Sequence, residues 1–258
     1  MPGIDKLLKG VLKYRSTIKD EMTQKLKEVT VNPQPTAVVF SCMDARVLPT
    51  RFCQTDVGDV YLVRNAGNLV PHSKGLGWHN ATTEPGALVL GCQMGDIRHV
   101  VVCGHSDCKA MNLLYSMRNE LDHHDGDALQ LWLRRHGSSS VQKFEQWEKM
   151  KGREPITFQA ETPRHNIEAL IDPENNFGIV DKFSQINTLN QLQNIASYPF
   201  LKEKLQTGKV RLHALWFDIH SGNVYIFSKM EKKFVEINEE NYGMLMEDSV
   251  KDPKIKHY

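Results

Sequence analysis

The sequence predicts an α/β fold, in which helices cover both faces of a central, mostly parallel sheet. Apolar runs of strand length recur along the chain, at 37–40, 59–64, 99–104 and 210–219. Their near-continuous apolar character is typical of buried parallel strands, and segments with helical spacing lie between them, as in other α/β folds. Ser221-Gly222-Asn223 then favours a hairpin into 224–227, which predicts an antiparallel strand at one edge of the sheet.

The bulk properties of the chain exclude several classes of protein. Its 258 residues suit one large domain or two small ones. The formal net charge is only +1, so no nucleic-acid partner is expected, and the apolar runs are too short for a membrane span. Five cysteines without paired spacing argue against a disulfide framework and predict a reducing, intracellular compartment.

Three side chains that ligate soft metals follow two of the predicted strands. Cys42 comes after the run 37–40, and His105 and Cys108 come after the run 99–104. A single cysteine behind an apolar strand is most often a small buried hydrophobe. However, ligands gather outside the carboxyl ends of parallel strands, and three protein ligands with an open fourth position are typical of catalytic zinc. The sequence therefore predicts one Zn²⁺ per chain.

Two charged residues stand close behind the first predicted ligand. Asp44 can accept the proton of a metal-activated water or orient its lone pair. Arg46 would keep Asp44 ionised and hold it in place; a local ion pair at the start of a helix is the simpler interpretation. A helix is predicted over 106–121, which would place His105 and Cys108 on one face of its first turn. Asp107 is expected to cap this helix, or else to pair with a ligand.

Cys42-Met43-Asp44-Ala45-Arg46 and His105-Ser106-Asp107-Cys108 together resemble the zinc signature of the β-class carbonic anhydrases, C-x-D-x-R followed by H-x-x-C. The segments 64–68, 187–201 and 212–218 are similar to further parts of that family. The resemblance implies a four-stranded parallel core, a homodimer or tetramer, and reversible hydration of CO2 to bicarbonate and a proton. Zinc would generate hydroxide from water, Asp44 would orient it, and Arg46 would orient Asp44.

The resemblance also implies a substrate pocket with an apolar wall, which suits uncharged CO2. Gln34 lies one position away from a pocket glutamine of plant members, and the spacing of Tyr61 and Ala66 from Cys42 matches an aromatic and a small apolar pocket position. Simple core packing is the alternative role for Tyr61. Lys109 departs from the glycine that family members usually carry there.

The N-terminal segment is predicted to form one amphipathic, basic helix over 4–29. It is either a mitochondrial targeting helix or a mature helix that packs on a partner subunit, as similar helices do in the family. The expected compartment is accordingly the mitochondrial matrix or the cytoplasm. The predicted organisation is an arm over 1–31, a zinc-binding α/β domain over 32–230 and a surface extension over 231–258, in a single domain overall.

Two other functions remain compatible with the motifs. Relatives of this fold hydrolyse carbon disulfide or carbonyl sulfide, and the predicted ligands do not distinguish these substrates. The site could instead be structural zinc, with Asp44 as a fourth ligand, or part of a partner-binding module without catalysis. The intact pair of Asp44 and Arg46 favours an enzyme.

Overall fold

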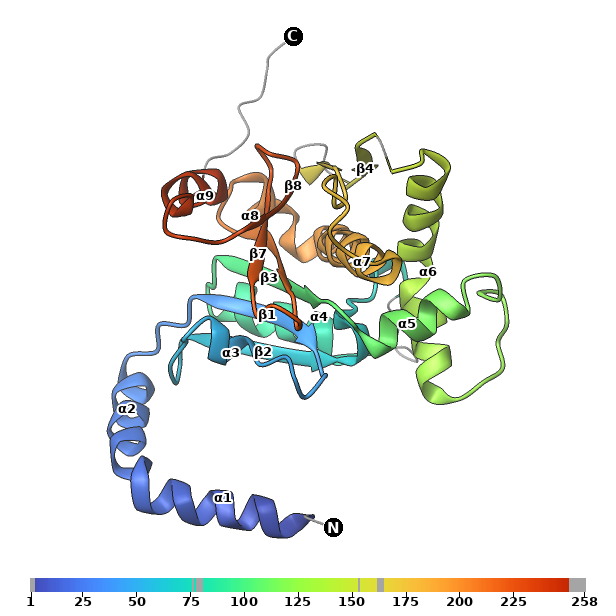
Figure 1. Cartoon of the computed structure of the whole chain (residues 1–258). Helices are drawn as coiled ribbons and strands as arrows, with labels where there is room; N and C mark the ends of the chain where they lie inside the picture. The colour runs from blue at the N-terminus through green and yellow to red at the C-terminus, as the bar shows by residue number, and fades with distance from the viewer. Residues whose placement is uncertain (1–2, 76, 78–80, 153, 162–164, 251–258) are drawn as a thin grey trace.

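Figure 1 shows the computed structural model, which describes residues 3–75, 77, 81–152, 154–161 and 165–250. A six-stranded sheet in the order β2-β1-β3-β6-β7-β8 forms its centre. The strands are β1 (Ala37–Cys42), β2 (Val60–Asn65), β3 (His99–His105), β6 (Arg211–Phe217), β7 (Val224–Ser228) and β8 (Lys233–Glu236). The first four in spatial order are parallel, and β7 and β8 are antiparallel. The predicted α/β class with a four-stranded parallel core is therefore confirmed.

The register of the parallel strands brings their carboxyl ends to one edge. Cys42, the last residue of β1, pairs with Asn65 at the end of β2, and His105, the last residue of β3, pairs with Phe217 at the end of β6. β1 and β3 are neighbours, so the residues that follow them lie next to each other at this edge.

Helices cover both faces of the sheet. On one face α7 (Ile179–Ala196) approaches β3 so closely that a Cβ at Gly104 would lie 2.0 Å from Thr188 Oγ1. The opposite face carries α3 (Pro49–Phe52), where the Phe52 ring stacks on Phe217 with 4.7 Å between centroids. The α4 helix (Thr83–Leu88) continues into a wider turn over Val89–Met94, in which Gly91 abuts Val38 of β1 on the face that α7 also covers.

The α7 helix is unusual because it has no solvent-facing side. Every residue from Lys182 to Ile195 is buried, although many of these side chains are polar. Such groups are stable in the interior only when they are hydrogen-bonded, and those of α7 bond to backbone groups of neighbouring loops and to α6 (Ala128–Lys149). Ser139 and Ser140 lie inside α6.

The N-terminal arm differs from the single helix that was predicted. It consists of α1 (Ile4–Thr17) and α2 (Lys19–Val31), which are separated at Ile18, and it extends away from the body of the chain (Figure 1). No residue of either helix is buried. The apolar side of α1 is between 55% and 67% exposed at Ile4, Leu7, Leu8, Val11 and Leu12.

The segment after residue 230, expected as a surface extension, contributes to the main sheet. It supplies β8 and then α9 (Tyr242–Val250), which buries Leu245 and Asp248. Asp248 Oδ2 accepts a 2.7 Å hydrogen bond from Ser228 Oγ at the end of β7. The remaining elements are α5 (Lys109–Ser116), β4 (Ile156–Phe158), β5 (Ile167–Ala169) and α8 (Lys202–Gln206). Among the described residues, no helix is both long and apolar enough to span a membrane.

Candidate metal centre

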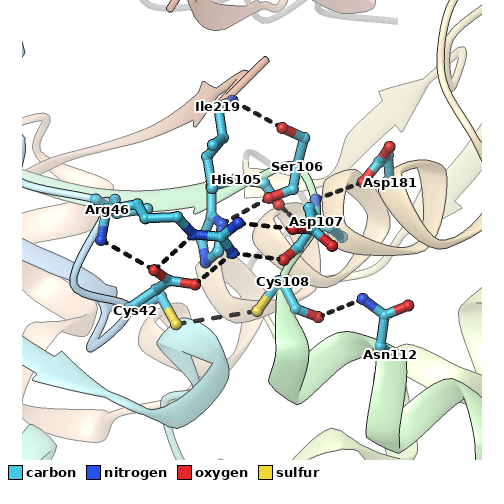
Figure 2. Close-up of polar contacts among 12 residues, drawn as sticks. Cys42, Arg46, His105, Ser106, Asp107, Cys108, Asn112, Asp181 and Ile219 are labelled. Atoms are coloured by element: carbon cyan, nitrogen blue, oxygen red, sulfur yellow. Dashed lines mark hydrogen bonds and ion pairs between the residues drawn. The ribbon is translucent and has the colours of Figure 1, made fainter.

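Three ligand atoms converge at the carboxyl edge of the parallel sheet. The atoms come from Cys42, His105 and Cys108, and all of them lie within 4.8 Å of one another. Cys42 ends β1, His105 ends β3, and Cys108 is the residue before α5. Each residue is at most 4% exposed, and the two Sγ atoms are 3.9 Å apart (Figure 2). The sequence-predicted ligands therefore form one compact, buried cluster.

The segment between the second and third of these residues is not the helical turn that was expected. Ser106 still pairs with the sheet, since its N–H donates to Phe217 O over 3.0 Å. Asp107 then has a left-handed backbone with φ of +49°, and α5 begins only at Lys109. Cys108 therefore approaches His105 through a left-handed turn at Asp107 rather than through helical spacing.

One nitrogen of His105 is left available for a metal. Its Nδ1 lies 2.8 Å from Ser106 O, and an imidazole in this position donates its proton to the carbonyl. Its Nε2 is buried and has no hydrogen-bond partner among the described residues. A buried, unpaired nitrogen is unfavourable in an apolar setting, and a metal ion would satisfy it.

The hydrogen bond between the two thiols shifts their pKa values in opposite directions. The hydrogen bond with Cys108 and the proximity of His105 lower the pKa of Cys42 to about 4, although burial opposes this shift. The same hydrogen bond, together with burial, raises the pKa of Cys108. The pair therefore retains one proton near neutral pH, and a bound dication would displace it because metals bind the thiolate form. Two thiolates and one imidazole match the donor set of catalytic zinc.

Asp44 lies beside this cluster and is bound to Arg46 on two sides. Arg46 Nε donates to Asp44 Oδ1 over 3.0 Å, and Nη2 donates to Oδ2 over 2.7 Å. The Arg46 N–H also donates to Oδ1. These hydrogen bonds from Arg46 hold the pKa of Asp44 well below its usual range. Asp44 is therefore a fixed, ionised acceptor next to the metal ligands.

Asp107 was expected to cap the helix that follows it, but it does not cap α5. Cys108 is the N-cap residue, and no side chain makes a capping hydrogen bond there. The Asp107 carboxylate instead accepts a 2.7 Å hydrogen bond from Arg46 Nη1 (Figure 2). Its role is thus set by a residue distant in the sequence.

Arg64 is a further residue of the centre, and the sequence indicated it only through the resemblance. Its guanidinium donates to the carbonyl oxygens of Cys42, Asp44 and Val47, over 2.7–3.0 Å. These bonds hold the backbone that carries the Asp44 side chain. A buried or half-buried arginine that serves carbonyl groups gives no distinctive local pattern, so spacing alone could not have found it.

The α7 helix holds the loop after β2, which includes Gly67 and Val70 and borders the metal centre. Asn187 Nδ2 donates to Gly67 O, Gln191 Oε1 accepts from Val70 N, and Asn194 Nδ2 donates to Val70 O. The sequence predicted this helix but not the function of its polar residues. Its polar composition, in a helix expected to cover a sheet, was the available signal.

One chain brings together only part of the predicted pocket. Ala66 adjoins Gly67, whose backbone is hydrogen-bonded to the Cys42 thiol. The carbonyl oxygen of Ala66 accepts a hydrogen bond from Trp132 Nε1. Tyr61 pairs with Val38, far along β1 from Cys42, and is 40% exposed. Gln34 lies before β1, at the opposite end from Cys42. Within a single chain, Tyr61 and Gln34 therefore do not line the metal centre.

The sequence of this chain was then compared with known proteins. The profile of the family described as carbonic anhydrase matches residues 37–224. Beta carbonic anhydrase 1 of Caenorhabditis elegans is 44% identical over 248 residues, which cover 94% of this chain and 92% of the relative. The chain belongs to the β-class carbonic anhydrases. This finding confirms the resemblance inferred from the two motifs.

A more distant carbonic anhydrase matches over a similar extent of the chain, and a solved structure shares the fold. A carbonic anhydrase of Pseudomonas aeruginosa is 28% identical over 236 residues, which cover 90% of this chain and 91% of the relative. The solved structure of the β-carbonic anhydrase CcaA superposes with a TM-score of 0.70 at 23% identity and covers 92% of each chain. Since that identity is low, CcaA supports the fold of this β-carbonic anhydrase and nothing finer.

Proposed function

We propose that the protein is a zinc enzyme that catalyses the reversible hydration of CO2 to bicarbonate and a proton. The observation that carries this proposal is the convergence of Cys42, His105 and Cys108 within 4.8 Å, beside a carboxylate that Arg46 keeps ionised. A structural zinc site would be expected to have four protein ligands. Here the fourth candidate, Asp44, has both oxygens bound to Arg46, which favours catalysis.

Each residue of the centre has a distinct role in the proposed reaction. Two Sγ atoms and His105 Nε2 would hold Zn²⁺, which when bound acts as a Lewis acid and acidifies a water molecule. Asp44, held as a carboxylate, would accept a hydrogen bond from a water molecule at the centre and orient it toward the carbon of CO2. Arg46 fixes the orientation of Asp44 through two parallel hydrogen bonds. A small residue such as Ala66 leaves space for an uncharged, linear substrate.

We also infer that the enzyme assembles as a homodimer, which can pair into a tetramer. The apolar side of α1 is exposed within one chain, and β2 is an edge strand with Tyr61 and Leu62 more than one third exposed. A second copy that covers them could bring Gln34 and Tyr61 to the partner's pocket. Two β-carbonic anhydrases of Sordaria macrospora, described as tetrameric, share the fold with a TM-score of 0.62 at 18% identity.

We propose that the same arm decides between the two expected compartments, the mitochondrial matrix and the cytoplasm. Basic residues on α1 and scarce acids fit a mitochondrial targeting helix, which predicts the matrix, whereas a retained arm on a partner predicts the cytoplasm. Mass spectrometry of the N-terminus of protein isolated from its native cells distinguishes them. Cleavage close to residue 31 supports targeting, and an intact N-terminus supports the cytoplasm.

The decisive experiment is stopped-flow CO2 hydration at alkaline pH, with the zinc content of each sample measured. Wild type should carry one zinc per chain and turn over rapidly. Asp44→Ala should keep its zinc and lose most of its activity, whereas Asp122→Ala, in an exposed loop, serves as a matched control. If wild type holds zinc but does not hydrate CO2, carbon disulfide is the next substrate to test, and failure with both leaves a structural site.

A further inference from the structure

Arg46 is bound by two carboxylates rather than one. On one side it makes the paired hydrogen bonds to Asp44. On the other side Nη1 donates to Asp107 Oδ2 over 2.7 Å, and Nη2 donates to the Asp107 carbonyl over 3.0 Å. All three guanidinium nitrogens are therefore engaged (Figure 2). An arginine side chain that is 40% exposed would otherwise retain much of its rotational freedom.

Asp107 is itself held firmly by the fold. Its N–H donates to Asp181 Oδ1, in the first turn of α7, over 2.8 Å. The preceding residue, Ser106, donates through Oγ to Asp218 Oδ1 over 2.7 Å and accepts from the N–H of Ile219. Because the Asp107 backbone and the preceding residue, Ser106, are both hydrogen-bonded to other elements, the Asp107 carboxylate offers Arg46 a fixed contact.

No other role explains the Asp107 carboxylate. It does not cap α5, and it does not belong to the cluster of potential metal ligands among the described residues. Its side chain is 45% exposed, so it does not fill the core. Among the described residues, the side chain of Asp107 is bound to Arg46.

We propose that Asp107 is a positioning residue for the reaction, which fixes the guanidinium of Arg46 and thereby the carboxylate of Asp44. The functional unit is then Asp44–Arg46–Asp107 rather than the pair alone. Because Asp107 stands between His105 and Cys108, the same segment that supplies two ligands also orients the catalytic carboxylate. This inference rests on the proposed function.

The test is the variant Asp107→Asn. Asparagine removes the charge, keeps the shape and tolerates the left-handed backbone at this position. We expect its kcat to fall about five- to ten-fold, as for the loss of a charge-assisted hydrogen bond. The KM and zinc content should stay at wild-type values, because Asp107 lies outside the cluster of potential metal ligands and its side chain is bound to Arg46. Asp122→Asn, an exposed acid in the loop before α6, is the matched control and should match wild type.

A second measurement does not depend on activity. Phenylglyoxal modifies accessible arginines, and peptide mass spectrometry reports the rate at Arg46 in the zinc-free proteins. We expect Arg46 of Asp107→Asn to react several-fold faster than in wild type or in Asp122→Asn. If wild type lacks CO2 hydration altogether, the proposed function fails, while this rate still decides whether Asp107 restrains Arg46.

A double-mutant cycle separates action through Arg46 from an independent effect. In the background of Arg46→Gln, the change Asp107→Asn should reduce kcat no further, because the link is already broken. If the losses of kcat in Asp107→Asn and Arg46→Gln multiply in the double variant, the proposal is overturned. An unchanged kcat in Asp107→Asn, or an unchanged rate of phenylglyoxal modification at Arg46, would also overturn it. Loss of zinc in proportion to activity would also overturn it, because Asp107 would then act on the ligand segment alone.

Discussion

Gly104 and Thr188 set the separation between β3 and α7. A Cβ at Gly104 would lie 2.0 Å from Thr188 Oγ1 and 3.1 Å from Trp216 Cδ1. The hydroxyl of Thr188 is itself fixed, because it donates to Ser184 O over 2.8 Å. The residue before His105 is thus confined to glycine by the α7 helix, which packs against it.

Gly104→Ala should destabilise the protein and displace His105. Overpacking of this kind reduces the free energy of unfolding by about 1–3 kcal/mol, and zinc content should fall with it. Urea denaturation and metal analysis check both effects. Thr188→Ala removes the closest atom, so the double variant should recover part of the loss; an unaffected single variant would show that α7 can move away.

The hydration rate should rise toward alkaline pH. Two thiolates neutralise the formal charge of Zn²⁺, so the metal should acidify its water less than a site with three histidines would. Titration of Asp44 does not cause this rise in rate, since its hydrogen bonds with Arg46 hold the pKa of Asp44 well below the usual range. Stopped-flow rates between pH 6 and 9 measure the profile. A rate that stays flat down to pH 6 would contradict this explanation.

His213 should make the protein less stable in acid. Burial, together with nearby positive groups that include His99, lowers the pKa of His213 to about 3. A histidine in the unfolded chain has a pKa of about 6.5. Between about pH 6.5 and the lower pKa of folded His213, the unfolded state therefore binds more protons than the folded state. The free energy of unfolding consequently falls as the pH falls through this window. His213→Gln should lose less of its urea midpoint between pH 7.5 and 5.0 than wild type, both without zinc. His124→Gln, an exposed histidine, should lose as much as wild type.

Asn187 should be essential for the loop that borders the metal centre. It donates to Gly67 O and accepts from Ser140 Oγ and Gln191 Nε2, all without exposure to solvent. Asn187→Ala leaves these groups unpaired, and we expect a loss of about 2–3 kcal/mol in the free energy of unfolding. Asn119→Ala, at an exposed position, is the control. Equal stability of the two variants would mean that the network rearranges.

The N-terminal arm should determine the assembly state. A chain that begins at residue 32 lacks the exposed apolar side of α1. We therefore expect it to sediment as a smaller species than the full chain at the same concentration in analytical ultracentrifugation. Leu8→Glu, which places a charge on that apolar side, should have the same effect, whereas Lys9→Glu should not. A full-length chain that is monomeric would contradict the proposed dimer.

The sequence predicted the parallel sheet and the metal ligands because both depend on short, local patterns. Buried parallel strands read as continuous apolar runs, and residues at their ends must meet at one edge. Cys42 and His105 followed directly from these two rules. The break at Ile18 has no glycine or proline to signal it, so the arm was predicted as a single helix.

What the sequence did not predict depends on contacts between distant residues. Asp107 looks like a helix cap by its position, and only its contact with Arg46, which is far away in the chain, gives it another role. Strand β8 is only four residues long and two of them are charged, and it exists because β7 offers it a pairing edge. In the same way, the polar residues of α7 make sense only when the loops that they bind are in place.

The burial of α7 on all sides also has a dynamic consequence. Backbone amides exchange their hydrogens with solvent only when the surrounding structure opens, and interior elements open last. A helix in which every residue from Lys182 to Ile195 is buried can expose its amides only by releasing the sheet and the loops of the metal centre together. Deuterium uptake in this segment should therefore report the global unfolding of the catalytic domain, while the exposed arm exchanges within the shortest labelling times.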